Sequence, residues 1–219
     1  MQPVPSKHEL AYREIRERII DGRFGPGKRL VLSSLARELD VSPVPVREAI
    51  RRLEAEGLVH FERNVGARVA MLQDDEWEQL VRMLALLDGY AFAAAVTRVS
   101  PEDLQEARGY NAQLREAAAA GPVDHALVMA LHRRFHRALY RRCGNRYVIE
   151  SLDGIWDRID ASRVLVTLYP ALRLATAVNE HDGLLERLAR GEDDAATLEA
   201  CAREHNLNAI RAIRSAAGN

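Results

Sequence analysis

Apolar residues recur at helical spacing along most of this chain, and the longest regular stretches lie after residue 72. From there on, apolar positions fall three and four residues apart, with only short breaks between successive stretches. This spacing gives each segment one apolar stripe, which is typical of amphipathic helices packed around a shared core. We therefore expect an all-α antiparallel bundle of about six helices, over roughly 74–98, 101–119, 122–143, 145–167, 170–190 and 192–216.

The first 72 residues follow a different pattern, in which glycines and prolines separate shorter elements. The segment DGRFGPGKRL is expected to be a turn. A second turn, DVS, precedes a helix whose N-cap can be Ser42 and whose first position suits Pro43. Helix, helix, turn, helix and hairpin is the order of a winged helix-turn-helix. The expected helices lie at 7–21, at 33–39 and from residue 43, and the expected strands at 58–62 and 67–72.

These two patterns predict a mainly α protein with an N-terminal winged helix-turn-helix DNA-binding domain over 1–72 and a helical domain over 73–219. The chain of 219 residues has 31 Lys+Arg and 32 Asp+Glu, which excludes a protein that coats nucleic acid through bulk positive charge. Residues 1–72 still carry a mild basic excess, 13 against 10, so the sequence allows a local basic surface there. Two cysteines, no apolar leader and no long uninterrupted apolar stretch predict a cytoplasmic chain without a membrane segment.

The third helix of the first domain has the features of a helix that reads the DNA major groove. Its apolar stripe faces a core, while the opposite face carries Val44, Arg47 and Arg51. The hairpin tip adds further positions that could contact bases or phosphates, namely Arg63, Asn64, Gly66 and Arg68. The alternative is an ordinary charged surface, whose arginines pair with the interspersed Glu48, Glu54, Glu56 and Glu62.

Four of the seven histidines fall on inward-facing positions of three different helices. His132 and His136 are four residues apart and are therefore neighbours on one helix face. His181 and His205 each lie between apolar residues of a further helix. Taken alone, each of these histidines could be an ordinary core residue that is hydrogen-bonded to a carbonyl or a carboxylate. A shared divalent metal better explains why four such histidines occur together, because imidazole is a good ligand for zinc, nickel and iron.

The motifs PGKRL, LARELDVS, PVREAIRRLEAEGLV and NVGARVA resemble the GntR family of bacterial transcription regulators over about residues 7–72. The resemblance implies a homodimer on palindromic operator DNA, with one recognition helix in each half-site. It also implies that Arg47 is a principal DNA contact and that Ser42 and Arg51 contact the backbone or bases. Gly66 matches the glycine of the wing tip. The family pattern Arg-Thr-Pro-Val-Arg reads Pro-Val-Pro-Val-Arg here, so Val44 could instead meet a thymine methyl group.

The second domain resembles the FCD ligand-binding domain of the FadR-like branch of this family, in its shorter VanR-like form. The resemblance rests on FHRAL, the GN that follows, the pair EH and a late histidine. It implies a divalent metal that holds the carboxylate of a small organic acid. His136, His181 and His205 match the three usual histidine ligands, and His132 stands at the position of the usual aspartate. The site would then have four histidines and be more cationic than its relatives, or His132 would not join it.

Two arginines are candidate contacts for the carboxylate of such an effector. Arg82 falls where family members often place an arginine near the pocket, and Arg163 is a second candidate. The alternative for Arg82 is an ion pair with Asp88 or with a neighbouring helix.

The favoured function is a DNA-binding transcription regulator, most simply a repressor, whose operator affinity depends on a small carboxylate effector at a metal site. One alternative is a regulator that responds to the divalent metal itself, zinc before nickel or iron. Another is a metal-dependent enzyme with a DNA-binding head. The enzyme is disfavoured because Arg133 follows His132 where the zinc-protease motif H-E-x-x-H has its glutamate. We therefore expect no catalytic activity.

Overall fold

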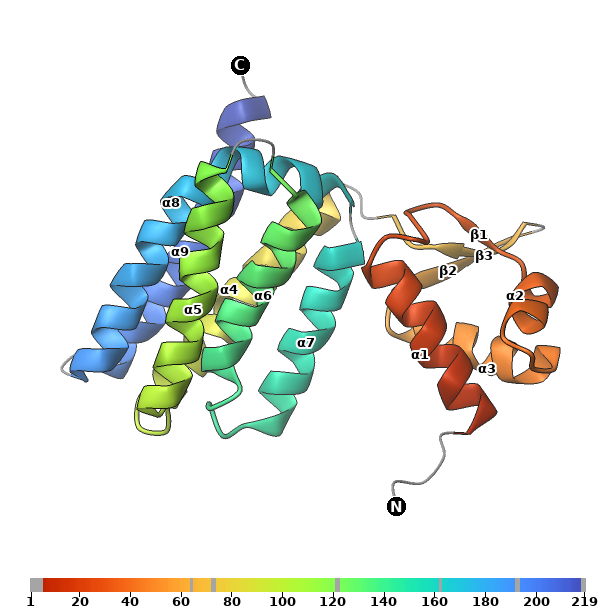
Figure 1. Ribbon diagram of the computed structural model, residues 1–219, viewed down its shortest axis with the longest axis horizontal. Coiled ribbons are helices and arrows are strands. Elements are labelled where there is room, and N and C mark those ends of the chain that lie inside the picture. Colours follow the sequence, from red (N-terminus) through yellow and green to blue (C-terminus); the bar gives the residue numbers. More distant parts are fainter. Residues whose placement is uncertain are drawn as a thin grey trace. The chain divides into compact units, whose positions relative to one another are not determined.

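The computed structural model describes residues 6–63, 65–71, 74–120, 123–161, 163–191 and 194–217. The chain divides into two compact units (Figure 1). The first contains Met1–Leu72 together with Asp157–Arg163, and the second contains Gln73–Trp156 and Val164–Asn219. Among the described residues the fold is mainly helical, as the sequence predicted, with one small sheet in the first unit.

Apart from one additional strand, the first unit has the order of elements that the sequence predicted for a winged helix-turn-helix. Its elements are α1 (Lys7–Ile20), β1 (Arg29–Leu30), α2 (Leu32–Glu38), α3 (Pro43–Ala55), β2 (Val59–Glu62) and β3 (Gly66–Val69). The sheet is antiparallel, with strand order β1-β3-β2. Strands β2 and β3 form the predicted hairpin, in which Val59 pairs with Val69 and Glu62 with Gly66.

The structure corrects the prediction that the segment DGRFGPGKRL is only a turn. Its last two residues, Arg29 and Leu30, form β1 and pair with Arg68 and Ala67 of β3. Leu30 is buried in the core of the unit. A strand of two residues shows too little alternation of apolar and polar positions to be recognised in the sequence.

Helix α3 begins at Pro43, as predicted, but its capping differs from the prediction. Ser42 occupies the N-cap position with an extended backbone, yet its side chain makes no capping hydrogen bond. An N-cap oxygen normally accepts a hydrogen bond from the second or third helical N–H. The third helical residue here is Pro45, which has no N–H. The exposed Ser42 hydroxyl is therefore not used to cap the helix.

The apolar stripe predicted for α3 packs into the core of the first unit. Ile50 and Leu53 are fully buried and belong to one apolar cluster with Ile15 and Ile19 of α1. Ala161, the last residue of α7 (Arg146–Ala161), belongs to the same cluster. Because this face of α3 is buried, the opposite face is left exposed to solvent.

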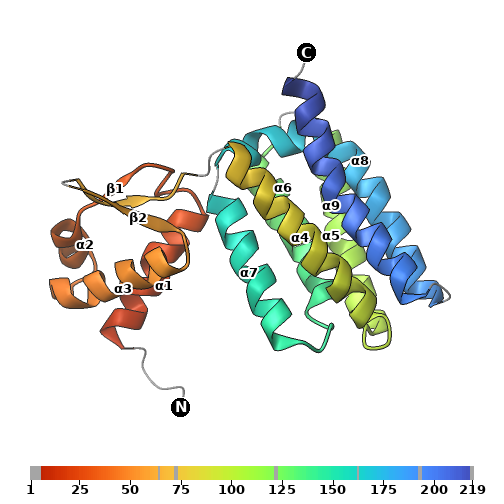
Figure 2. The same cartoon turned by 180° about the vertical axis from the view of Figure 1, so that it is seen from behind.

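Six further helices follow among the residues that the structure describes, as the sequence predicted, and Figures 1 and 2 show them from two sides. They are α4 (Asp74–Ala95), α5 (Pro101–Ala119), α6 (His125–Tyr140), α7, α8 (Arg163–Arg190) and α9 (Ala195–Ala217). Helix α4 packs along α9, and α5 packs along α6. None of the described helices is both long and apolar enough to cross a membrane.

One helix boundary differs from the prediction. The sequence indicated a break just before Pro170, but α8 runs through this residue from Arg163 to Arg190. A proline inside a helix removes one backbone hydrogen bond, and tertiary packing can outweigh that loss in a long helix. The apolar stripe of α8 beyond the proline, which includes Leu174 and Val178, is buried in the second unit.

Helix α5 begins with a complete capping box. The Asp103 N–H donates to the Ser100 hydroxyl (3.2 Å), and the Ser100 N–H donates to the Asp103 carboxylate (2.9 Å). The same carboxylate accepts hydrogen bonds from Arg141 and Arg142, just after the end of α6 (2.8 Å each). This buried carboxylate therefore joins the start of α5 to the end of α6.

Candidate metal centre and nucleic-acid interface

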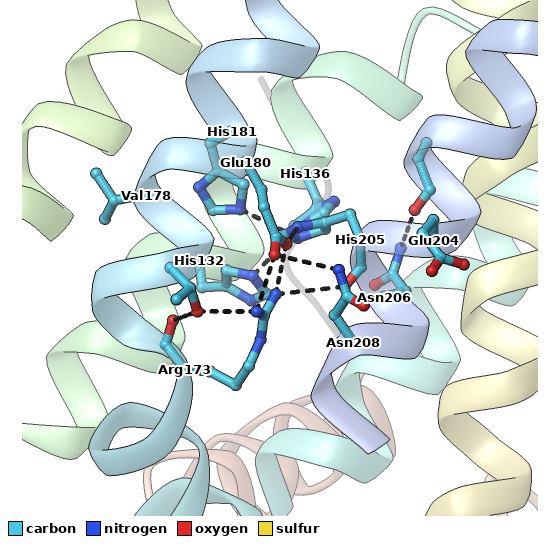
Figure 3. Close-up of polar contacts among 12 residues, drawn as sticks. His132, His136, Arg173, Val178, Glu180, His181, Glu204, His205, Asn206 and Asn208 are labelled. Atoms are coloured by element: carbon cyan, nitrogen blue, oxygen red, sulfur yellow. Dashed lines mark hydrogen bonds and ion pairs between the residues drawn. The ribbon is translucent and has the colours of Figure 1, made fainter. Parts of the chain in front are cut away.

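Four histidines from three helices of the second unit meet at one place (Figure 3). His132 and His136 lie one turn apart on α6, His181 lies on α8 and His205 on α9. Each side chain is buried. One nitrogen of each ring lies within 4.8 Å of one nitrogen of every other ring. The structure thus brings together all four histidines that the sequence singled out as candidate metal ligands.

Three of the four rings are held by an oxygen that accepts a hydrogen bond from Nδ1. The pairs are His136 with Asp88 (3.0 Å), His181 with Asn111 (2.9 Å) and His205 with Glu180 (2.6 Å). Carboxylate and amide oxygens accept hydrogen bonds, so each Nδ1 carries the proton of its neutral ring. Nε2 then keeps a lone pair, which is the form that binds a metal.

Buried amides position two of these acceptors. The amide nitrogen of Asn111 donates to a backbone oxygen of α8 (3.0 Å) and to Asp182 (2.8 Å), which directs its oxygen toward His181. The amide nitrogen of Asn206 donates to Asp88 (2.9 Å). Both asparagine side chains are buried, so the orientation of the rings is fixed by bonds that water does not compete for.

The Nε2 atoms point toward one another (Figure 3). Nε2 of His205 lies 3.2 Å from Nε2 of both His136 and His181, and Nε2 of His132 lies 3.3 Å from Nε2 of His136. Lone pairs that face one another repel unless a proton or a cation lies between them. An ordinary core role explains the Nδ1 bonds but not this convergence. The residues present therefore fit a divalent metal bound by imidazole nitrogens.

Burial favours the neutral form of His132, His181 and His205. Loss of hydration lowers the pKa of His132 and His181 well below the ordinary value, and the neighbouring histidines and Arg173 lower it further. Burial also lowers the pKa of His205, although its hydrogen bond to Glu180 acts in the opposite direction. Metal binding at neutral pH therefore does not have to displace a proton from these three rings.

An arginine that was not among the predicted site residues lies beside the histidines. Arg173, on α8, is 5% exposed, and its guanidinium donates to both carboxylate oxygens of Glu180 (2.9 and 2.5 Å). Burial raises the pKa of Glu180, but hydrogen bonds from His205 and Arg173 lower it more, to about 2. The two residues are seven positions apart on α8. This spacing of about two turns is the signal that could have identified the pair.

Two aromatic side chains pack against the histidine rings. Phe135 stacks on His181, with ring centroids 3.8 Å apart. Trp156 of α7 lies edge-on to His132, at 5.4 Å between centroids, and is tilted against His136, at 5.6 Å. Both aromatic rings are buried, so they shield one side of the histidines from water, which strengthens the charge interactions there.

The two arginines predicted to contact an effector are placed differently. Arg82, on α4, has a side chain that is 54% exposed, and it donates to Glu78 one turn earlier (2.9 and 2.7 Å). The predicted alternative of an ion pair with Asp88 is not formed, because Asp88 bonds to His136 and Asn206. Arg163 is the first residue of α8, and its side chain lies outside the described part of the structure.

The proposed reading face of α3 is exposed. Val44 is 58% exposed, and Arg47 and Arg51 are exposed as well. Within the described residues, no ion pair involves Arg47 or Arg51. Two of the interspersed glutamates pair with other arginines: Glu56 with Arg52 (3.2 Å) and Glu62 with Arg68 (2.7 Å). Arg47 and Arg51 therefore do not fit the alternative of a charged surface whose arginines pair with the interspersed glutamates.

The wing contributes fewer free groups than the sequence suggested. Arg63 is exposed at the turn between β2 and β3, and Gly66 has a φ of +100°, which favours glycine. Asn64 lies outside the described residues. Arg68 donates to the backbone oxygen of Gly27 (2.8 Å) and pairs with Glu62, so it stabilises the sheet.

Comparison with known proteins gives two family matches. Residues 79–208 match the FCD domain, and residues 7–69 match the bacterial regulatory proteins of the gntR family. The FCD match covers most of the second unit, including all four histidines, and the gntR match covers α1 to β3.

Individual relatives match along most of their length. The transcriptional repressor GlaR of Escherichia coli K12 is 26% identical over 213 residues, which cover 95% of this chain and 96% of the relative. The regulator McbR of the same strain is 27% identical over 168 residues, covering 77% of this chain and 74% of the relative. The solved structure of E. coli McbR/YncC has the same fold, with a TM-score of 0.78 at 24% identity. This structural match covers 99% of the present chain and 100% of the McbR/YncC chain.

Proposed function

The chain belongs to the gntR family of bacterial regulatory proteins that carry an FCD domain, and on this premise we propose what its histidine site does. It is a DNA-binding regulator of transcription and not an enzyme, as the sequence predicted. We propose that it is a repressor, and that a small organic acid bound at a divalent metal in the histidine site controls its operator affinity. The convergence of the Nε2 atoms on one point is the observation that carries this proposal.

The proposed metal ligands are the Nε2 atoms of His132, His136, His181 and His205. Imidazole donors suit zinc, and nickel or iron would fit the same set. When bound, the metal supplies a positive centre that holds a carboxylate. The protein's own part is to orient the rings through Asp88, Asn111 and Glu180, a type of support that usually matters for metal affinity.

The charges around the histidines favour an anionic effector. Asp88 and Glu180 are negative, Arg173 is positive, and the histidines are neutral ligands. These groups carry one net negative charge, which a divalent metal more than balances. An organic acid would therefore be attracted to the loaded site. Arg173 is our candidate for a second contact with its carboxylate, and the contacts proposed for Arg82 and Arg163 stay predictions.

We propose that the DNA-binding form is a homodimer on a palindromic operator, since gntR regulators bind operators and typically act as dimers. Each copy would place α3 in the major groove of one half-site and the wing beside it. The proposed contacts are Ser42, Val44, Arg47, Arg51, Arg63, Asn64 and Gly66. The exposed Ser42 hydroxyl supports this assignment, as do Arg47 and Arg51, which form no ion pair with the described residues.

Elemental analysis of untagged protein purified without chelator tests the metal site. We expect about one zinc, nickel or iron per chain, and its loss in His136→Ala. His60→Ala is the matched control, because it changes an exposed histidine of β2 and should keep the metal. A wild-type protein that holds no metal even after zinc is added would contradict the proposal.

The effector is tested on metal-loaded protein with an operator fragment selected from random DNA. A panel of small mono- and dicarboxylates is added, and operator affinity is followed by fluorescence anisotropy. We expect at least one acid to shift the affinity in wild type and to have no effect in His136→Ala. A full panel without effect on the wild type would count against an organic acid effector.

A second candidate, a regulator that responds to the metal itself, is favoured by one observation. All four proposed ligands are imidazoles, so no carboxylate ligand compensates the charge of the ion. This function predicts that operator affinity follows free zinc with no organic acid present. Operator affinity that is unchanged across the zinc titration would exclude it.

A further inference from the structure

Helix α7 takes part in both compact units of the chain. Residues 146–156 group with the second unit, and residues 157–161 group with the first. The division therefore falls inside one continuous helix, between Trp156 and Asp157. These two adjacent residues have partners of very different kinds.

Trp156 contacts the histidine site. Its indole ring packs against His132 and His136, with centroids 5.4 and 5.6 Å away, and it is buried. Both histidines are proposed ligands. When their rings are drawn toward a bound ion, the surface on which the indole rests changes. Close packing leaves little free space to absorb such a shift, so Trp156 has to follow it.

Asp157 contacts the DNA-binding unit. Its carboxylate forms an ion pair with Arg16 of α1. One residue later, the guanidinium of Arg158 lies against Gly57, where an added Cβ would come within 3.2 Å of Arg158 Nε. Ala161 is part of the apolar cluster that contains the core of α1 and α3. The last turn of α7 is therefore built into the unit that carries the reading helix.

Helix geometry links the two sets of contacts. Adjacent helical residues differ by about 100° in direction and about 1.5 Å in rise, so a rotation or shift of α7 moves both side chains together. Helix shifts of about 1–2 Å are a common form of allosteric change. Arg16 lies on α1, which packs directly against α3. A shift of α7 would therefore move α1, the helix against which the reading helix α3 packs.

We propose that α7 transmits the state of the histidine site to the DNA-binding unit, with Trp156 as the contact to the ligands and the Asp157–Arg16 pair as the contact to α1. This inference rests on the proposed metal site and adds the route of regulation. Trp156 and Asp157 are positioning residues here, because neither is proposed to bind metal, effector or DNA.

Hydrogen exchange of the full-length chain, with zinc as the only added ligand, tests the route. Zinc added to metal-free wild type should slow exchange in α6, α8 and α9, and it should change the exchange of α1 by about twofold or more. In Asp157→Asn and in Arg16→Gln, we expect the response of α6, α8 and α9 to remain and the response of α1 to fall by at least half. Trp156→Phe, with a smaller ring, should also weaken the response of α1 while zinc content is kept.

Two controls separate transmission from general destabilisation. Glu150→Gln removes an exposed carboxylate that pairs within α7, and it should leave the response of α1 unchanged. The double variant Arg16→Gln/Asp157→Asn should respond like either single variant, because all three lack the same pair.

The outcomes distinguish this inference from the proposal on which it rests. If zinc slows exchange in α6, α8 and α9 but leaves α1 unchanged in wild type, the route is wrong and the metal site stands. The route is also wrong if Asp157→Asn and Arg16→Gln both transmit the full change to α1. If zinc changes no part of the wild-type protein, the metal site is wrong, and the inference falls with it.

Discussion

Asn111 supports the histidine site without being one of its proposed ligands. Its oxygen holds His181 through Nδ1, and its own amide is fixed by Asp182. We predict that Asn111→Ala lowers zinc affinity about 10- to 100-fold, as loss of such support does in other metal sites. Zinc competition with a chromophoric chelator measures the affinity. Gln113→Ala, an exposed position of the same helix, is the control and should bind zinc as wild type does.

His132 is the proposed ligand that distinguishes this site from the aspartate-containing sites that the sequence resembles. We predict that His132→Asp keeps zinc, because a carboxylate is also a zinc ligand, but weakens the binding of an anionic effector by adding a negative charge. Elemental analysis measures whether zinc is kept, and the change of operator affinity on adding the effector measures effector binding. If His132→Ala holds zinc as tightly as wild type, His132 is not a ligand and the site has three histidines.

The histidines could be found in the sequence because four polar residues on apolar stripes are unusual. The spacing of Arg173 and Glu180 allows an ion pair within α8, but neither Arg173 nor Trp156 gives a sequence signal of its place beside the histidines. A lone arginine on a long helix is most often a surface residue, and a tryptophan on an apolar stripe is most often an ordinary core residue. Their roles depend on which helices lie side by side, and this is decided by packing that one sequence does not reveal.

At the scale of the element, two of the three arginines of α3 have separate tasks. Arg47 is exposed and outside the described ion pairs, whereas Arg52 binds Glu9 (3.0 Å) and Glu56 (3.2 Å) and lies 3.6 Å from the ring centroid of Tyr12. We predict that Arg47→Ala lowers operator affinity by about 1–3 kcal/mol with little change in stability. Arg52→Ala should instead lower the melting temperature.

Anisotropy titrations and thermal unfolding of the two α3 variants measure these effects side by side. Salt dependence adds a further distinction, since loss of a phosphate contact lowers the slope of log affinity against log salt by about 1. Equal losses of operator affinity in both variants would contradict the assignment of Arg47 as the reading residue.

The buried carboxylate of Asp103 makes the junction of α5 and α6 sensitive to acid. Burial alone would raise its pKa, but hydrogen bonds from Arg142, the Ser100 N–H and Arg141 lower that pKa well below its ordinary value. A carboxylate whose pKa is lower in the folded state contributes stability above its unfolded pKa, about 3.9, and loses it as pH falls toward the folded pKa. We predict that Asp103→Asn costs about 2–3 kcal/mol at pH 7.

The same linkage predicts that the difference between wild type and Asp103→Asn shrinks below about pH 4. Urea unfolding between pH 3 and pH 7 measures this difference in the free energy of unfolding. Glu116→Gln, an exposed position of α5, should show no comparable pH-dependent loss. A cost that is constant across this range would mean that the charge of Asp103 is not what stabilises the junction.

Most elements could be predicted because their apolar stripes are long. The exceptions have physical reasons. Strand β1 is only two residues long, Pro170 lies inside a helix whose packing continues beyond it, and Asp157 gives no sign of which unit it joins. The periodicity of α7 identifies a helix, but it does not show that the partners of its last turn lie about 140 residues earlier in the chain, at Arg16.

For the whole molecule, the proposed palindromic operator requires two copies of the chain, and α4 offers a surface for their contact. Met83, Leu86 and Tyr90 lie on successive turns of this helix and are 50%, 47% and 44% exposed. Among the side chains that the structure describes in the second unit, the other exposed large apolar residues, Leu127 and Tyr147, are each single on their helices. In a two-fold dimer both copies present the same patch, so one apolar stripe suffices for both sides. The occupant we assign to this stripe is therefore a second copy of the chain.

We predict that Leu86→Glu weakens dimerisation by about 2 kcal/mol or more, roughly 30-fold in dissociation constant, because a charge replaces apolar surface at the contact. Analytical ultracentrifugation measures the dimer, and a titration at saturating DNA gives the number of chains per operator. Leu127→Glu is the matched control, with similar exposure on α6, and should remain dimeric. Operator affinity should fall in Leu86→Glu in proportion to the dimer that is lost, while zinc content stays unchanged, since the stripe contains no proposed ligand. A Leu86→Glu protein that dimerises like the wild type would place the contact on another surface, and a wild type that binds its operator as one chain would refute the dimer itself.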